Sequence, residues 1–288
     1  MPPEGILKNP PIPGIKHSCG YAKARGHVMV DRTALKNLVE YIAGSVEKAR
    51  AVDSPFYHLE FDSIFPADVY EQILAAKPVY EDYRPMSGRS KGHVRDDGTA
   101  TRVKIDLFPE YIRALPSGKR ELWDLVGRAL CSTPVQHAFV RRLAKPLEKR
   151  FGPNYANTGL YPIPILTRDI PGYEIQPHTD TKWKGITVQL YLPGDNDHTN
   201  IGTIFHSVNA DGSLEKAAKM KFARNSGYAF AVGGDTWHSA DPVDASVDTR
   251  DSILLTYFVD SGLLPVLKNR TKRIGNFVRN EVRQLTRQ

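Results

Sequence analysis

The sequence predicts an α+β protein in which a mainly helical N-terminal half supports a jelly-roll-like β-core. The first observation is a series of apolar residues at helical spacing between residues 31 and 152. The second is a change of period after residue 153, where eight short strand-like runs follow one another. Eight short strands of this kind are typical of a jelly-roll-like barrel. We expect one domain over 1–288, made of an irregular arm (1–30), mainly helical support (31–152), a β-core (153–262) and a basic C-terminal helix (263–288).

The N-terminal half predicts four helices and two short strands. Asp31 is a suitable N-cap for the first helix, and Pro146 should kink or end the last one. Residues 86–101 contain three glycines and few apolar side chains, which indicates a loop that can act as a lid. The expected elements in order are helix 33–50, strand 56–62, a helix from Pro66 to before Pro78, strand 103–107, helix 118–131 and helix 134–150.

The C-terminal half predicts the eight strands of the core. Gly or Asp/Asn clusters separate several of them, as expected for short connections. The candidate strands are 158–167, 173–180, 185–192, 202–208, 218–223, 227–232, 236–240 and 250–259.

Composition indicates a folded protein rather than a membrane-spanning or disulfide-stapled one. The chain has 288 residues, of which 41% are hydrophobic, and it carries two cysteines. No apolar run approaches the roughly 20 residues that span a bilayer, and the N-terminus has no secretory signal pattern. So few cysteines give no disulfide framework, which predicts a cytoplasmic location.

The positive charge is concentrated at the C-terminus. Residues 268–288 contain seven basic residues and one acidic residue, so this segment carries six of the net +7 charges. The rest of the chain is nearly neutral, which makes nucleic acid an unlikely partner. The simplest interpretation of the segment is a terminal helix with a solvated basic face; the alternative is a platform for an acidic partner.

The most informative motif is His178-Thr179-Asp180, followed much later by His238. In a strand, residues i and i+2 lie on the same face, so His178 and Asp180 can point at one metal ion. Two imidazoles and one carboxylate can occupy one face of an octahedral Fe(II) and leave the opposite face open. The same set also suits Zn²⁺, so the three residues alone leave the metal open.

A candidate carboxylate-binding pair follows the late histidine. Arg250 and Ser252 share a face if this stretch is a strand, and a guanidinium beside a hydroxyl is well suited to bind a carboxylate. The alternative for Arg250 is a surface salt bridge with Asp248 or Asp251, which would contribute little stability.

Taken together, these motifs resemble the core of the Fe(II)/2-oxoglutarate-dependent oxygenases, a double-stranded β-helix. The resemblance covers about a third of the chain. It is carried by Arg168-Asp169-Ile170-Pro171-Gly172-Tyr173, Pro177-His178-Thr179-Asp180, Gly202-Thr203, Trp237-His238 and Arg250-Asp251-Ser252.

The resemblance implies a chemistry and roles for individual residues. The cofactors would be Fe(II), held by His178, Asp180 and His238, with 2-oxoglutarate and O₂ converted to succinate and CO₂ as an unactivated C–H bond is oxidised. Arg250 and Ser252 would hold the distal carboxylate of 2-oxoglutarate. Because Asp180 is a carboxylate, where halide-transferring relatives have a small residue, hydroxylation is expected rather than halogenation.

Other candidate contacts depend on strand phase. Tyr161 and Gln189 lie on strands expected to line the barrel, and either can hydrogen-bond the cosubstrate if its side chain faces inward. Arg168 and Lys182 flank the metal strand, and a cluster of the two would suit a carboxylated or phosphorylated substrate.

The leading functional hypothesis is an Fe(II)/2-oxoglutarate-dependent dioxygenase that hydroxylates a small molecule, such as an amino acid, a sugar or a biosynthetic intermediate. A second hypothesis retains the chemistry and makes the substrate a protein or a nucleic acid. A third, of a different class, is a non-catalytic metal-binding β-helix module.

Overall fold

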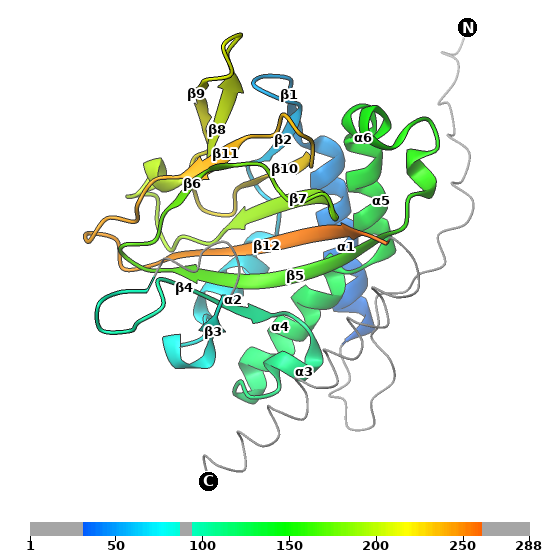
Figure 1. Ribbon diagram of the computed structural model, residues 1–288. Coiled ribbons are helices and arrows are strands. Elements are labelled where there is room, and N and C mark those ends of the chain that lie inside the picture. Colours follow the sequence, from blue (N-terminus) through cyan, green and yellow to red (C-terminus); the bar gives the residue numbers. More distant parts are fainter. Residues whose placement is uncertain (1–30, 87–93, 261–288) are drawn as a thin grey trace, which may run out of the picture.

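The computed structural model describes residues 31–86 and 94–260, which form an α+β protein with antiparallel sheets (Figure 1). The helices are α1 (Arg32–Lys48), α2 (Ala67–Ala75), α3 (Pro109–Ile112), α4 (Ser117–Leu130), α5 (Thr133–Arg142) and α6 (Ala144–Phe151). The strands of the N-terminal half are β1 (Arg50–Val52), β2 (His58–Phe61), β3 (Arg84–Pro85) and β4 (Arg102–Asp106). Those of the C-terminal half are β5 (Leu160–Asp169), β6 (Ile175–His178), β7 (Lys184–Tyr191), β8 (Ile204–Val208), β9 (Leu214–Lys219), β10 (Gly227–Ala231), β11 (His238–Ala240) and β12 (Arg250–Val259).

The strands form one large and one small sheet. The large sheet has the order β1-β2-β10-β7-β12-β5-β4-β3, and the small sheet has the order β6-β11-β8-β9. From β5 to β12 the chain alternates between the sheets, except for the β8–β9 hairpin within the small one. The segment expected to be mainly helical support also contributes β1 to β4, which extend the large sheet at both edges.

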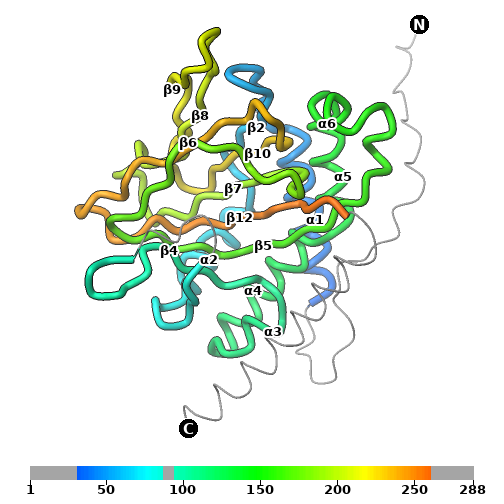
Figure 2. The backbone as a smooth tube through the Cα atoms, viewed as in Figure 1, coloured from blue at the N-terminus to red at the C-terminus, as the bar shows by residue number. Residues whose placement is uncertain are grey.

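Helices cover one face of the large sheet, and the small sheet packs against the other (Figures 1 and 2). Helix α1 contributes Leu38, Ile42 and Val46, which recur every four residues and are buried in the main core. Its start is capped by Asp31, whose side chain accepts a hydrogen bond from the Thr33 amide at 2.8 Å. An aromatic cluster that includes Phe205 and Phe230 fills the space between the two sheets.

The central strand β12 places different kinds of residue on the two faces of the large sheet. Ile253, Leu255 and Tyr257 are buried in the core beneath the helices. The alternate residues, among them Arg250 and Ser252, face the other way because side chains alternate along a strand. Arg250 and Ser252 are thereby directed between the sheets.

Two expected elements differ in the structure. The helix expected over 134–150 is divided into α5 and α6, with the break at Leu143 and with Pro146 in the first turn of α6. A proline is tolerated there because the first-turn amides have no helical acceptor.

The strand expected at 218–223 is instead β9, at Leu214–Lys219. Met220 and Phe222 are buried, but their amides bond the carbonyls of Thr203 and Thr199, outside the ladder. Their apolar character reflects packing, which sequence pattern does not distinguish from strand pairing.

Within residues 31–86 and 94–260, no helix has both the length and the apolar character needed to cross a membrane. The expected arm over 1–30, the basic helix over 263–288 and part of the 86–101 loop lie outside the described residues.

Candidate metal centre

Three potential ligands converge at the neighbouring ends of β6 and β11. His178 ends β6 and lies directly opposite His238, which begins β11, and their rings are 4.4 Å apart between centroids. Asp180 lies two residues beyond the end of β6, in the segment that connects β6 to β7. One ligand atom from each residue lies within 4.8 Å of the other two.

Backbone contacts orient both imidazoles. The Nδ1 atom of His178 lies 2.9 Å from the Gln176 carbonyl oxygen, and that of His238 lies 3.0 Å from the Thr236 carbonyl oxygen. A carbonyl only accepts, so in each neutral ring Nδ1 carries the hydrogen and Nε2 keeps its lone pair for a metal.

Burial favours the neutral form of His238. Burial lowers its pKa from 6.5 to about 4, with a further lowering by His178, while Asp180 opposes the shift. The side chain therefore has the protonation state that metal binding requires at neutral pH.

Asp180 is held as an anion by two neighbours. Lys184 Nζ lies 2.6 Å from Oδ1, and the Thr187 hydroxyl donates to Oδ2 at 2.6 Å. Burial opposes ionisation, but Lys184, His238 and these hydrogen bonds outweigh it and lower the pKa of Asp180 to about 2. Two neutral imidazoles and one carboxylate fit a divalent ion such as Fe(II).

Arg250 is buried within the sheet interior. Its Nε and Nη2 atoms lie 3.2 and 3.1 Å from Asp169 Oδ2, and its Nη1 donates to the Ile201 carbonyl at 2.8 Å. The surface salt bridge considered for Arg250 is thus replaced by a buried pair with Asp169. Asp251 bonds Arg168 instead, at 2.7 and 3.0 Å.

Ser252 and Gln189 lie together on the same sheet face as Arg250. The Gln189 amide donates to the Ser252 hydroxyl, which is also 2.8 Å from the hydroxyl of Thr167. Thr187, the partner of Asp180, precedes Gln189 by two residues on β7 and so faces the same way. Asp180 of the triad and the Ser252–Gln189 pair therefore contact one face of the large sheet, and the two histidines lie on the small sheet that packs against that face.

Tyr161 is not part of this group. It lies opposite Phe258 at the other end of β12 and stacks on that ring, with centroids 5.6 Å apart. Six positions of β12 separate Phe258 from Ser252.

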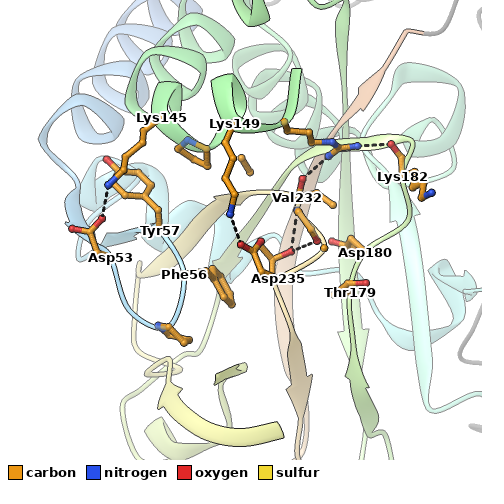
Figure 3. A pocket seen from close by; sticks show the side chains of 17 residues that line it. Asp53, Phe56, Tyr57, Lys145, Lys149, Thr179, Asp180, Lys182, Val232 and Asp235 are labelled. Carbon is orange, nitrogen blue, oxygen red and sulfur yellow. Dashed lines mark hydrogen bonds and ion pairs between the residues drawn. The ribbon is translucent and has the colours of Figure 1, made fainter. Parts of the chain in front are cut away.

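A cavity of about 980 Å³ adjoins Asp180 of the triad (Figure 3). Thr179, Asp180 and Lys182 line it from the turn after β6, and Lys145 and Lys149 line it from α6. The expected cluster of Arg168 with Lys182 does not form, because Arg168 is paired with Asp251 while Lys182 borders the cavity.

Sequence reasoning missed several residues of the site. Lys184 and Thr187 were not singled out, although both contact Asp180. Asp169 was noted only within the Arg168–Tyr173 motif, and Arg102 was not singled out. Their spacing along the chain carried no signal, because the contacts arise between strands.

No family model and no curated protein matches the chain. It is similar to a solved prolyl-4-hydroxylase from Pseudomonas putida, with 14% identity, 78% of this chain and 100% of that chain covered, and a TM-score of 0.44. It is also similar to a prolyl hydroxylase from Trichoplax adhaerens in complex with a hypoxia inducible factor peptide fragment (13% identity, 81% and 94% covered, TM-score 0.48). A third is an oxidoreductase of the 2OG-Fe(II) oxygenase family from Burkholderia pseudomallei (13%, 83% and 97%, TM-score 0.41).

The chain is thus similar to these solved structures in fold alone. At 13–14% identity and TM-scores of 0.41–0.48, these likenesses carry no argument about activity.

Proposed function

We propose that this protein is an Fe(II)/2-oxoglutarate-dependent dioxygenase that hydroxylates an unactivated C–H bond of a small molecule. The observation that carries the proposal is the convergence of His178, Asp180 and His238, with Nδ1 of each imidazole held by a backbone carbonyl, opposite the large-sheet face that bears Arg250 and Ser252. A hydrolytic zinc site has no use for a buried guanidinium and hydroxyl at this position, so this conjunction favours the oxygenase.

Each residue has a distinct role in this proposal. His178, Asp180 and His238 hold the metal, and Lys184 and Thr187 fix the orientation of the Asp180 carboxylate. Arg250 and Ser252 bind and orient the distal carboxylate of 2-oxoglutarate, with Gln189 holding the Ser252 hydroxyl. When bound, Fe(II) with 2-oxoglutarate and O₂ supplies the oxidising equivalent, and the outcome proposed here is hydroxylation because Asp180 retains a ligating carboxylate.

The strand order supports a double-stranded β-helix. The strands β5, β12, β7 and β10 are consecutive in the large sheet, and β6, β11, β8 and β9 make up the small sheet. Alternation of successive strands between two facing sheets is what a jelly-roll-like barrel requires.

A small anionic substrate is favoured by the cavity beside the triad. Lys145, Lys149 and Lys182 border it, and the first two are paired with exposed carboxylates, an arrangement that a ligand can displace (Figure 3). A protein or nucleic-acid substrate, or a metal-binding module without activity, remains the alternative that experiment must separate.

The first test is an anaerobic titration of the purified protein with Fe(II) and 2-oxoglutarate. We expect the weak visible charge-transfer band of the chelate in the wild type, a weaker band in Arg250→Ala and none in His178→Ala. Succinate release under O₂ should follow the same order. Absence of the band and of succinate, with tightly held zinc or no metal, would contradict the proposal.

A further inference from the structure

A second guanidinium shares the carboxylate that holds Arg250. In the large sheet, Asp169 of β5 is paired with Arg250 of β12 on one side and with Arg102 of β4 on the other. Because residues directly opposite one another face the same way, all three side chains lie on the sheet face that bears Ser252. Arg102 Nε lies 3.1 Å from Asp169 Oδ1, and Arg250 Nη2 lies 3.1 Å from Oδ2.

The two guanidinium groups also share one aromatic ring. The Cζ atoms of Arg102 and Arg250 lie 4.6 and 5.4 Å from the ring centroid of Tyr173. Arg102 Nη1 donates a hydrogen bond to the Tyr173 hydroxyl. The three contacts bring both cations to one place in the interior.

This cluster has one more positive charge than negative charge. The side chains of Arg102, Arg250 and Asp169 are 12%, 7% and 2% exposed, so water screens the excess charge poorly. A buried charge without a counter-ion costs several kcal/mol, on the order of the penalty for breaking a buried pair. The site therefore favours an anion.

The neighbouring ionic group, made of Lys104, Asp106 and Arg84, does not supply that anion. Lys104, which follows Arg102 by two residues, shares Asp106 with Arg84, so two cations again face one carboxylate. Burial lowers the pKa of Lys104, with Asp106 opposing the shift. The excess positive charge thus extends along this edge of the interior.

Donors remain for a carboxylate. Of the five N–H groups of Arg250, its Nε, Nη1 and Nη2 atoms use one each on Asp169 and Ile201. Among residues 31–86 and 94–260, Nη2 of Arg102 donates no hydrogen bond. Guanidinium groups with spare donors are suited to bind a carboxylate through two hydrogen bonds.

The cluster belongs to the same interior as the metal ligands. Thr187 and Gln189 project from the same face of β7, where Thr187 donates to the Asp180 carboxylate and Gln189 donates to the Ser252 hydroxyl. Ser252 and Arg250 in turn share one face of β12, so the cluster and Asp180 contact the same side of the large sheet.

We propose that Arg102, on a strand outside the eight-strand core, binds the distal carboxylate of 2-oxoglutarate together with Arg250, and that Asp169 positions both guanidinium groups. This inference rests on the proposed function. It assigns a second cation to the cosubstrate site, in addition to the Arg250–Ser252 pair.

Because the cluster carries an excess positive charge, replacing Arg102 should weaken 2-oxoglutarate binding without destabilising the ligand-free protein. Arg102→Gln removes the excess charge and leaves Asp169 paired with Arg250. The metal-free, cosubstrate-free protein should then melt no lower than the wild type. A purely structural Arg102 would instead lower the melting temperature when replaced.

The experiment compares two 2-oxo acids in the anaerobic Fe(II)-loaded protein, by the chelate band and by the shift in melting temperature. The acids are 2-oxoglutarate and 2-oxopentanoate, which has a methyl group in place of the distal carboxylate. We expect Arg102→Gln to weaken 2-oxoglutarate binding about ten- to a hundredfold, as for loss of a charge-assisted hydrogen bond. Binding of 2-oxopentanoate should change less than about twofold, since it lacks the group that Arg102 contacts.

Two further variants control for folding and charge. Arg102→Lys keeps the positive charge but loses the planar pair of N–H donors. It should therefore recover part of the 2-oxoglutarate affinity that Arg102→Gln loses. Arg84→Gln removes a guanidinium that pairs with Asp106 instead of Asp169. This variant should leave 2-oxoglutarate affinity near that of the wild type.

Equal weakening of both acids by Arg102→Gln and Arg102→Lys would overturn the proposal in favour of a structural role. Unchanged 2-oxoglutarate binding in both variants would overturn it as well. A wild-type protein that binds neither acid would overturn the proposed function together with this inference. A wild type that binds 2-oxoglutarate with no dependence on Arg102 would overturn this inference alone.

Discussion

The Asp180 carboxylate has two protein partners that a metal must accommodate. Lys184 contacts one oxygen and Thr187 the other, each at 2.6 Å. Lys184 acts as the counter-ion of Asp180 in the metal-free protein, and a divalent cation takes over that role while repelling the ammonium group. The two partners should therefore affect metal affinity in opposite directions.

Lys184→Met should make the metal-free protein less stable and metal binding tighter. The Asp180 side chain is 7% exposed, and loss of its partner costs up to about 3–5 kcal/mol, less here because Lys184 is 22% exposed. The metal restores the missing charge, so its stabilising effect should increase. Thermal unfolding with and without Mn²⁺ measures both effects; a smaller metal-induced shift than in the wild type would contradict this prediction.

Thr187→Val should weaken metal binding about 10- to 100-fold, because it removes the hydrogen bond that orients the ligating carboxylate. Thr256→Val is the matched control, since Thr256 is the direct partner of Thr187 on β12 and is equally buried. Isothermal titration with Mn²⁺ compares the two. Equal losses in both variants would show that the effect comes from packing.

At the level of elements, the side chain of Arg150 on α6 connects the helices to the metal site. Its Nη1 donates to the carbonyls of Lys184 and Val232, both at 2.6 Å, and its Nη2 donates to that of Lys182. Lys182 and Lys184 follow Asp180 along the chain, and Val232 directly follows β10, before the turn that leads to His238. One guanidinium thus fixes both backbone segments that carry ligands.

Arg150→Gln should lower metal affinity about tenfold, because both ligand-bearing segments lose an anchor. Arg142→Gln is the control: Arg142 donates to the Ala49 carbonyl at 2.6 Å, at the end of α1. That variant should lower the free energy of unfolding by about 1–3 kcal/mol and leave metal affinity unchanged. Comparable metal affinity in the two variants would refute the role assigned to Arg150.

Most elements were predictable because their periodicity is local. The helix over 33–50 appears as α1, and the strand expected at 250–259 has those bounds as β12. The break between α5 and α6 and the start of β9 were misplaced because they depend on what Leu143 and Met220 pack against. Tertiary packing decides such boundaries, and a residue's own character does not reveal it.

At the scale of the whole molecule, one face of the large sheet packs in the apolar core and the other carries residues of the candidate site. The helical face buries apolar residues such as Leu255, whereas the opposite face carries Arg250 and Ser252. Substitutions on the two faces of the same strand should therefore have different consequences.

Leu255→Ala should lower the free energy of unfolding by about 2–5 kcal/mol, because the fully buried side chain would leave a cavity. The fraction that stays folded should bind 2-oxoglutarate with wild-type affinity, since the residue faces the helices. Chemical denaturation and the chelate band give the two quantities. A large loss of affinity per folded molecule would show that the two faces are coupled.

The sequence by itself determined the α+β class, most strands of the C-terminal half and the three candidate ligands His178, Asp180 and His238. These depend on residue type, on period and on order along the chain, all of which are local. The single-domain organisation and the basic C-terminal helix stay predictions.

Only the tertiary structure decided the partners of those residues. Lys184 at Asp180, Arg150 at the backbone of two loops, and Arg102 beside Arg250 are brought together by strand register and sheet order. The physical reason is that electrostatic compensation acts between atoms that are close in space. Residues 102, 169 and 250 become neighbours only after the strands that carry them have paired.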